Sequence, residues 1–274
     1  MPISESQTEL LQQLISSDDI ETVIQGFDLL DMLIEEEKDL WSFFGNIETE
    51  DEYHVNLDAF HHKSYIAIWL MGKMYELHLP GFPDIPITQL QFSDKLLTQL
   101  PDNIDKIIHL EKLTLTESNL TKLPPNIQFL SNLKELDISR CPFSQFPEEI
   151  CHGPVAQSLQ YLNIDSCLFH EIPPTFGNLV NLITFSAYNV SLISLPSEII
   201  NCQQLRNINI SNRRRSFFWR RPRTSLHLPK EIGLLPNLQY LDLQDNTLGT
   251  IPTTLQNLYQ NFSIKDGKIL FPCT

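Results

Sequence analysis

Residues 110–132 read LEKLTLTESNLTKLPPNIQFLSN, and residues 238–260 read LQYLDLQDNTLGTIPTTLQNLYQ. The two stretches place their leucines at the same positions, and each carries a hydrophobic residue followed by proline in its second half. Seven such pairs share one phase along the chain: Leu100-Pro101, Leu123-Pro124, Phe146-Pro147, Ile172-Pro173, Leu195-Pro196, Leu228-Pro229 and Ile251-Pro252. Their prolines are 23, 23, 26, 23, 33 and 23 residues apart. A period of this length indicates a solenoid, in which each repeat buries its apolar side by stacking on its neighbours.

Each repeat combines a strand pattern with a helical turn. The alternation around Leu113 and Leu115 is typical of a short strand with one buried face. The proline cannot donate a backbone hydrogen bond, so we expect it on the return arm. Ile127 and Leu130 then have the three-residue spacing of a turn that faces the core. Equivalent units begin at Ile87, Leu110, Leu133, Leu159, Leu182, Leu205 and Leu238.

The two quoted stretches resemble the leucine-rich-repeat family, and the LPxxI signature looks like its 23-residue intracellular type, found in bacterial and plant Ras-group-related proteins. The resemblance implies an α/β fold, a curved horseshoe with short parallel strands on its concave face. It covers residues 74–260, about seven repeats of which the first piece, 74–86, is irregular. The position that usually holds Asn or Cys is only partly kept, as it reads Lys95, Ser118, Cys141, Cys167, Val190, Arg213 and Asn246.

Charge and cysteine usage limit the possible partners and compartment. The net charge is −15, and residues 1–73 contribute −13 of it, from 16 acids against three lysines. This sign disfavours general binding to nucleic acid or anionic membrane. The five cysteines form no disulfide framework, and the sequence shows neither a cleavable secretion signal nor a long apolar run. We therefore expect a cytoplasmic protein without a cofactor or a metal, and leave non-classical secretion open.

The acidic residues 1–73 predict a helical cap over the apolar end of the solenoid. Their patterns indicate helices over 5–16, 18–44 and about 58–71, followed by a strand-like piece at 75–79. A separate partner-binding helical module is the alternative. The cover is expected from Trp41, Phe43, Phe44, Trp69 and Leu70, and His54, His61 and His62 are expected to be solvated or core-edge histidines. Residues 261–274 predict a closing hairpin around Asp266-Gly267.

One repeat is ten residues longer than the period. The excess lies in SNRRRSFFWRRPRTS (211–225), just after a strand, where a loop can lean over the concave face. Arginine and aromatic side chains are enriched in interface hot spots. The candidate partner-binding residues here are Arg213, Arg214, Arg215, Phe217, Phe218, Trp219, Arg220, Arg221 and Arg223. Four roles remain open: binding an acidic protein partner, folding back on the chain's own acidic surface, contact with anionic membrane, or contact with nucleic acid.

The outward strand positions predict three columns on the concave face. The first is Gln89, Lys112, Glu135, Tyr161, Thr184, Asn207 and Tyr240; the second is Gln91, Thr114, Asp137, Asn163, Ser186, Asn209 and Asp242; the third is Ser93, Thr116, Ser139, Asp165, Tyr188, Ser211 and Gln244. Tyr161, Tyr188 and Tyr240 flank the arginine-rich stretch, and with Asp165 they form our candidate patch beneath it.

The sequence shows no motif that carries catalytic chemistry. Phosphate-binding loops, zinc-binding HExxH helices and nucleophile elbows are absent from it. We therefore predict a non-enzymatic protein–protein interaction module, such as an adaptor or a bacterial effector-like protein. The alternative is peripheral contact with anionic membrane or nucleic acid through 211–225.

Overall fold

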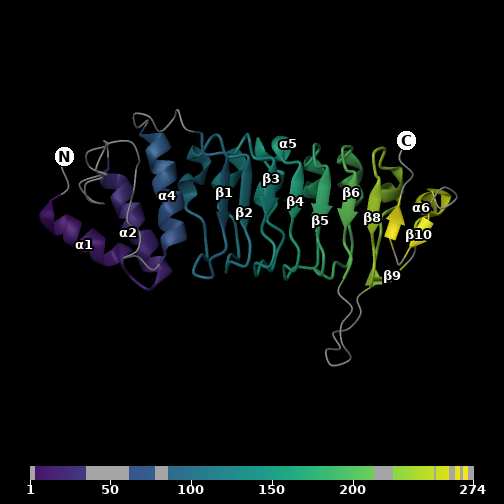
Figure 1. Cartoon of the computed structure of the whole chain (residues 1–274), viewed down its shortest axis with the longest axis horizontal. Helices are drawn as coiled ribbons and strands as arrows, with labels where there is room; N and C mark the ends of the chain where they lie inside the picture. The colour runs from purple at the N-terminus through teal and green to yellow at the C-terminus, as the bar shows by residue number, and fades with distance from the viewer. Residues whose placement is uncertain are drawn as a thin grey trace, which may run out of the picture.

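The computed structural model describes residues 4–34, 62–77, 86–212, 225–249, 251–258, 263–265 and 268–270. They form one elongated stack, with helices at the amino-terminal end and a row of strands along its length (Figure 1). This architecture is the predicted α/β solenoid. No described helix combines the length and the apolar character that crossing a membrane requires.

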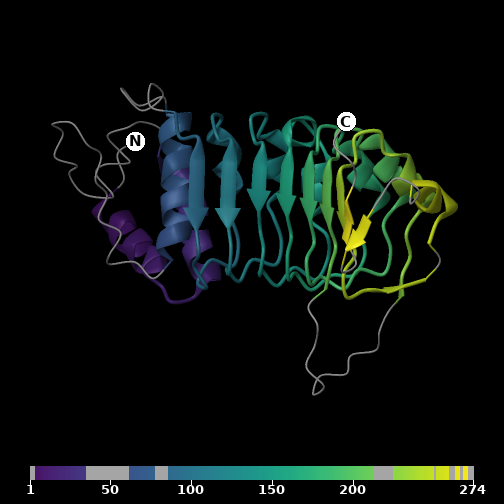
Figure 2. The same cartoon turned by 45° about the vertical axis from the view of Figure 1, so that its right-hand side comes forward.

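The strands form one nine-stranded sheet in the order β1-β2-β3-β4-β5-β6-β8-β11-β10. Strands β1 to β8 run parallel and in register, so that Leu113, Leu136 and Leu162 stack on one another. Figure 2 shows their arrows pointing the same way. The parallel strands are β1 (Gln89–Phe92), β2 (Lys112–Leu115), β3 (Glu135–Asp137), β4 (Tyr161–Asn163), β5 (Thr184–Ser186), β6 (Asn207–Asn209) and β8 (Tyr240–Asp242).

Two antiparallel strands end the sheet. β11 (Lys268–Leu270) pairs with β8, and β10 (Ser263–Lys265) pairs with β11. The two strands of the predicted hairpin are therefore present. Its predicted turn residues, Asp266-Gly267, lie outside the described residues.

The return arms carry short 3₁₀ helices directly after the repeat prolines. Those prolines have φ between −69° and −74°, the value that their ring imposes and that suits a helix start. The helices are η1 (Asp102–Lys106), η2 (Pro125–Phe129), η3 (Glu148–Cys151), η4 (Pro174–Asn178), η5 (Ser197–Asn201) and η6 (Lys230–Leu234), and the α-helix α6 (Thr253–Leu258) follows the last proline. The 26-residue repeat adds α5 (Val155–Ser158), and β7 (Ser225–Leu226) pairs with β9 (Thr247–Leu248) beside the sheet.

The repeated apolar residues form a continuous core between the sheet and the return arms. Leu113, Leu136 and Leu162 are fully buried, as the alternation predicts. Phenylalanines fill the middle of the stack, where the rings of Phe176 and Phe185 lie 4.9 Å apart. Asparagine side chains also link neighbouring repeats, since Asn132 Nδ2 donates to Ile108 O at 2.7 Å and Asn181 Nδ2 to Gln157 O at 2.7 Å.

The amino-terminal helices differ in extent from the prediction. They are α1 (Glu5–Ile15), α2 (Ile20–Leu33) and α4 (Lys63–Glu76). The helix expected over 18–44 ends early, because Ile34 takes an extended backbone (φ −88°, ψ 105°); residues 35–44 lie outside the described residues. The strand expected at 75–79 is wrong for Tyr75 and Glu76, which belong to α4. Burial explains this, because Tyr75 is packed into the core and its hydroxyl accepts from Ile87 N at 2.8 Å.

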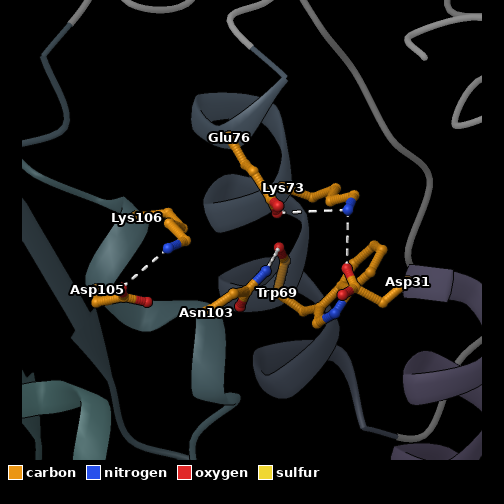
Figure 3. Close-up of polar contacts among 7 residues, drawn as sticks. All are labelled: Asp31, Trp69, Lys73, Glu76, Asn103, Asp105 and Lys106. Atoms are coloured by element: carbon orange, nitrogen blue, oxygen red, sulfur yellow. Dashed lines mark hydrogen bonds and ion pairs between the residues drawn. The ribbon is translucent and has the colours of Figure 1, made fainter. Parts of the chain in front are cut away.

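Helix α4 lies against the first repeat (Figure 2). Asn103 of η1 donates from Nδ2 to Trp69 O at 2.9 Å, and Gly72 lets the two backbones approach, since a Cβ there would lie 2.6 Å from Asn103 O. Lys73 is buried and pairs with Asp31 of α2 at 2.9 Å and with Glu76 at 3.3 Å (Figure 3). Phe27 packs on Trp69 with ring centroids 4.6 Å apart. The helices and the first repeat thus share one core, of which Trp69 and Leu70 are part.

Candidate functional site: the concave face

The strand register places the predicted columns side by side on the concave face. The first column runs through the paired residues Glu135, Tyr161 and Thr184, and the second through Asp137, Asn163 and Ser186. The third column continues past the strand ends, where Arg140 N donates to Asp165 O at 2.7 Å and Ser166 N to Tyr188 O at 2.8 Å. The face is thus a regular grid of polar positions.

The grid is uneven in charge. From β3 to β8 its fifteen positions include four carboxylates and neither lysine nor arginine. The cation of β2, Lys112, is already paired with Glu135 at 2.7 Å. The four carboxylates belong to Glu135, Asp137, Asp165 and Asp242.

Most of the second column has a structural role at the strand ends. The side-chain oxygen of each Asp or Asn accepts a hydrogen bond from the backbone amide two residues later, which closes an Asx turn. The donor–acceptor pairs are Ser139 N to Asp137 Oδ1 (2.9 Å), Asp165 N to Asn163 Oδ1 (3.0 Å), Ser211 N to Asn209 Oδ1 (3.1 Å) and Gln244 N to Asp242 Oδ1 (3.0 Å).

From β3 to β8, Ser186 is the one position of the second column that is neither Asp nor Asn, and Asp165 substitutes for it. Ser186 is too short to close the turn, and the amide of Tyr188 instead donates to Asp165 Oδ1 of the preceding repeat at 2.7 Å. The Ser186 hydroxyl donates to the same oxygen at 2.6 Å. The carboxylate that we singled out for a partner therefore also joins two repeats. The serine in a column of Asp and Asn is the sequence signal that points to this role.

Asp137 and Asp165 form no ion pair among the described residues, although the charge of Arg140 acts on Asp165 and that of Lys112 on Asp137. Asn163 Nδ2 donates to Asp137 Oδ2 at 3.0 Å, and Asn163 Oδ1 accepts from the backbone amide of Asp165 at 3.0 Å. Burial raises the pKa of Asp165, and the neighbouring charge of Asp137 raises it further. Among the described residues neither acid forms an ion pair, and Arg140 pairs with Glu117 instead. The hydrogen-bond donors to both carboxylates are thus neutral, and Asp165 Oδ1 accepts from Ser186 and Tyr188 of the following repeat.

The predicted tyrosines divide into two groups. Tyr161 is half-buried beside three acids: its pKa is raised by burial and by the charges of Asp137, Asp165 and Glu135. Tyr188 lies next to Asp165, through its backbone amide. Tyr240 instead donates its hydroxyl to Asp242 Oδ2 at 2.9 Å on β8.

The columns do not bring the two groups together. Tyr161 and Tyr240 share the first column, but Thr184 and Asn207 lie between them on β5 and β6. Three strand spacings, roughly 14 Å, separate the two tyrosines.

The predicted residues of the long repeat, Arg213 to Arg223, lie outside the described residues. Both ends of this stretch are held in the regular register. Asn212 N donates to Gln244 O at 2.9 Å beyond the carboxyl end of β6, and His227 N donates to Ile193 O at 2.8 Å on the return arm. The described residues on either side of the stretch thus keep the hydrogen-bond pattern of the solenoid.

An open hollow of about 700 Å³, which the sequence did not predict, lies where the three-residue insertion of the 26-residue repeat meets the following two repeats. Three repeats must stack before it exists, so no local motif signals it. Its polar side chains are mostly amides, and its lining includes His152, Gln157, Asn178, Asn181, Asn201 and Gln203.

Neither the described cysteines nor the described histidines form a reactive site. Cys141, Cys151, Cys167 and Cys202 are free and buried. Burial raises the pKa of the Cys141 thiol to about 11 and that of the other three to about 12, so the thiolate is disfavoured. Of the predicted histidines, only His62 lies within the described residues; it is buried, with Nε2 3.1 Å from Asp18 O. The described part of the chain holds no group of three potential metal ligands.

Comparisons with known proteins agree with this architecture. The leucine-rich-repeat family model matches residues 132–152, 158–179 and 237–258. A leucine-rich-repeat protein of Leptospira interrogans is similar in structure, with a TM-score of 0.50 and 31% identity over 58% of this chain and 37% of that chain. No curated protein sequence matches the chain.

Two further structures are less similar and show no more than a related shape. The PEPR1–AtPEP1 structure has a TM-score of 0.46 and 22% identity over 57% of this chain and 21% of that one. The TLR13–ssRNA13 complex has a TM-score of 0.47 and 20% identity over 56% of this chain and 21% of that one. The in-phase prolines, the parallel register and the three matched repeats all agree with a leucine-rich-repeat architecture.

Proposed function

We propose that this chain is a non-enzymatic protein-recognition module that binds a protein partner through its concave face and the stretch 211–225. The observation that carries the proposal is the grid from β3 to β8, a polar surface whose fifteen positions hold no lysine or arginine, in a chain whose sequence 211–225 is rich in arginine and aromatic residues. Leucine-rich-repeat folds generally serve as binding modules, and stacked repeats give an extended surface in place of a catalytic cavity.

The grid is suited to recognition because it is fixed before a partner arrives. Its side chains are held by Asx turns and by bonds between repeats, such as that from Asn163 to Asp137. A surface that is already ordered loses less conformational entropy on binding. The stretch 211–225 adds residue types that are common in hot spots, and the described Asn212 at its start follows the carboxyl end of β6.

The finer assignments remain part of this proposal. We place the module in the cytoplasm, as an adaptor or an effector-like protein, and we assign residues 1–73 to a cap, 74–260 to the repeats and 261–274 to a closing hairpin. The contacts of α4 with the first repeat, from Asn103 to Trp69 and from Ile87 to Tyr75, support the cap. Contact of the stretch 211–225 with anionic membrane or nucleic acid is the alternative.

Affinity capture with matched variants tests the proposal. One variant replaces residues 213–224 by Val-Ser, the two residues that follow Asn189 in the preceding repeat, and restores the 23-residue step. A second changes Tyr161 and Tyr188 to serine. The control, Phe129→Leu, removes an exposed aromatic ring from η2 on the return side.

We expect one partner to be captured by the wild type and by the control but lost from both test variants. Capture of the same proteins by all four chains would contradict the proposed surface. Sedimentation with anionic vesicles, and binding of an oligonucleotide, that are lost only on replacement of 213–224 would favour the alternative.

A further inference from the structure

From its charges and contacts, we infer that the concave face over β3, β4 and β5 binds an extended peptide segment that carries arginine or lysine side chains. The inference rests on the proposed function, because it names the chemistry of the partner at the same face. It concerns Glu135, Asp137, Tyr161, Asp165 and Tyr188, which the strand register brings to neighbouring positions.

The first argument is negative charge at Asp137 and Asp165 that is only partly compensated, because Lys112 and Arg140 act on these acids without a direct ion pair among the described residues. The carboxylates of Asp137 and Asp165 accept hydrogen bonds from neutral donors, and Asn163 joins the Asp137 carboxylate to the backbone amide of Asp165. Such donors orient a carboxylate but leave its charge in place. The charge of Asp137 raises the pKa of Asp165, so the two acids repel each other in the free protein. A cationic side chain between them would relieve this repulsion, which favours cations over neutral or anionic groups.

The second argument is the aromatic ring among these acids. Tyr161 is partly exposed on β4 and feels the charges of Asp137, Asp165 and Glu135. An aromatic face bordered by carboxylates can hold a guanidinium or ammonium group by cation–π attraction and ion pairing together. Arginine suits this arrangement best, because its planar group stacks on a ring while its donors reach carboxylate oxygens.

The third argument is the length of the polar surface. Beyond the acids, the same face continues with Thr184, Asn207 and Asn209 over β5 and β6. Four strands span roughly 14 Å between the first and the last, the length of about four extended residues. A free metal ion or a small amine would occupy only a fraction of this surface, whereas a peptide backbone can use the amide and hydroxyl groups that follow the acids.

Fluorescence anisotropy with defined probe peptides tests the inference without knowledge of the natural partner. The probe is a short labelled peptide of alternating glycine and arginine, and the matched peptides replace arginine by glutamine or glutamate. We expect the arginine peptide to bind at least tenfold more tightly than the glutamine peptide, and the glutamate peptide not to bind. Added salt should weaken the binding, since exposed charges are screened.

Matched variants separate this site from general attraction to an acidic chain. Glu135→Gln with Asp165→Asn removes two charges from the face, and the amide introduced by Asp165→Asn keeps an oxygen that can accept from Ser186 and Tyr188. Glu149→Gln with Glu171→Gln removes two charges from the return side. We expect the affinity for the arginine peptide to fall about tenfold in the first double variant and less than twofold in the second. Tyr161→Leu should lower the affinity for the arginine peptide about fivefold, whereas Phe129→Leu should not change it. Thermal melts check that each variant is folded.

Equal weakening by the two charge pairs, or equal binding of the arginine and glutamine peptides, would overturn the inference. It would leave the proposed function intact if affinity capture still found a partner that requires Tyr161 and Tyr188. A partner whose captured segment lacks basic residues would likewise refute the inference alone. Failure of both the peptides and the capture experiment would remove the proposed function as well.

Discussion

The repeat 205–237 is ten residues longer than the repeat 182–204 before it, and the extra residues lie at a single place after the strand. Their strands pair in register, with Phe185 opposite Ile208, and both return arms carry a 3₁₀ helix after the proline. After β5 the chain turns through Asn189, which has a left-handed φ of 60°, whereas the equivalent Asn212 is not left-handed. The described residues on either side of the extra ten keep the hydrogen bonds of the solenoid, such as those from Asn212 N to Gln244 O and from His227 N to Ile193 O. A solenoid tolerates an insertion where its chain reverses, because the core and the sheet do not depend on that turn.

The largest effect should come from the shared core of the two repeats. Phe185 is fully buried against Phe176, and Phe185→Ala should lower the free energy of unfolding by about 3–5 kcal/mol through lost contacts and a residual cavity. Urea denaturation measures the loss, with Phe129→Ala as the exposed control. A loss below about 1 kcal/mol would mean that the middle of the stack contributes little to stability.

Restoring the short turn should cost no stability. Replacement of 213–224 by Val-Ser shortens the connection between Asn212 and Ser225, which lowers the entropy of loop closure by up to about 1.5 kcal/mol. Asn212 would then take the left-handed turn that Asn tolerates. Urea denaturation should show a stability equal to the wild type or higher by that amount. A loss of more than about 2 kcal/mol would instead show that the stretch packs on its own chain.

The left-handed backbone at Asn189 makes a smaller contribution to stability, and the equivalent Asn212 of the longer repeat lacks it. Asn189→Ala should cost about 1 kcal/mol, since a Cβ without a polar group is disfavoured at this φ, and Asn189→Gly should be close to neutral. Asn212→Ala is the matched control, because Asn212 lies outside the left-handed region and its substitution should lack this backbone penalty. Thermal melts of the three variants rank them, and equal losses at both asparagines would contradict the assignment.

The smallest effect depends on pH. The pKa of Asp165 is raised, so the native state holds this proton more tightly than the unfolded chain, and stability falls as the pH rises through the folded pKa. Asp165→Asn cannot ionise and should therefore be at least as stable as the wild type near neutral pH. The difference should vanish in acid, where the aspartate is protonated in both states. Denaturation at several pH values checks this. An Asp165→Asn variant that is less stable than the wild type only at neutral pH would contradict the prediction.

Most of the solenoid could be predicted from the sequence, because each repeat independently supports the spacing found in the others. The columns from Gln89 to Tyr240 follow from the spacing of the leucines, and the strand register confirms them. The amino-terminal helices lack such repetition, so Tyr75 read as part of a strand although it lies in the buried face of α4. In a single helix that is buried on most sides, the choice between helix and strand depends on tertiary packing.

The candidate site was less predictable than the fold. The sequence placed Tyr161 and Asp165 on the concave face, but it did not reveal that Asp165 closes the turn of the next repeat. It also suggested one tyrosine patch, whereas the structure places Tyr240 with Asp242, apart from Tyr161. Such details depend on which side chains reach across neighbouring repeats, and a one-dimensional pattern does not contain that information.

The parallel register has a consequence for how such a protein can grow. Residues 182–204 form a complete unit whose two faces match those of its neighbours, because Phe185 stacks between Leu162 and Ile208. An in-frame duplication of this unit would add one strand between β5 and β6 and widen the concave face by about 4.8 Å, while both ends of the stack stay as they are. The antiparallel β11 cannot be copied in this way, because a parallel strand does not continue its hydrogen-bond pattern. Lengthening by duplication is therefore possible only among the interior units, and the width of the recognition surface can change in steps of one repeat.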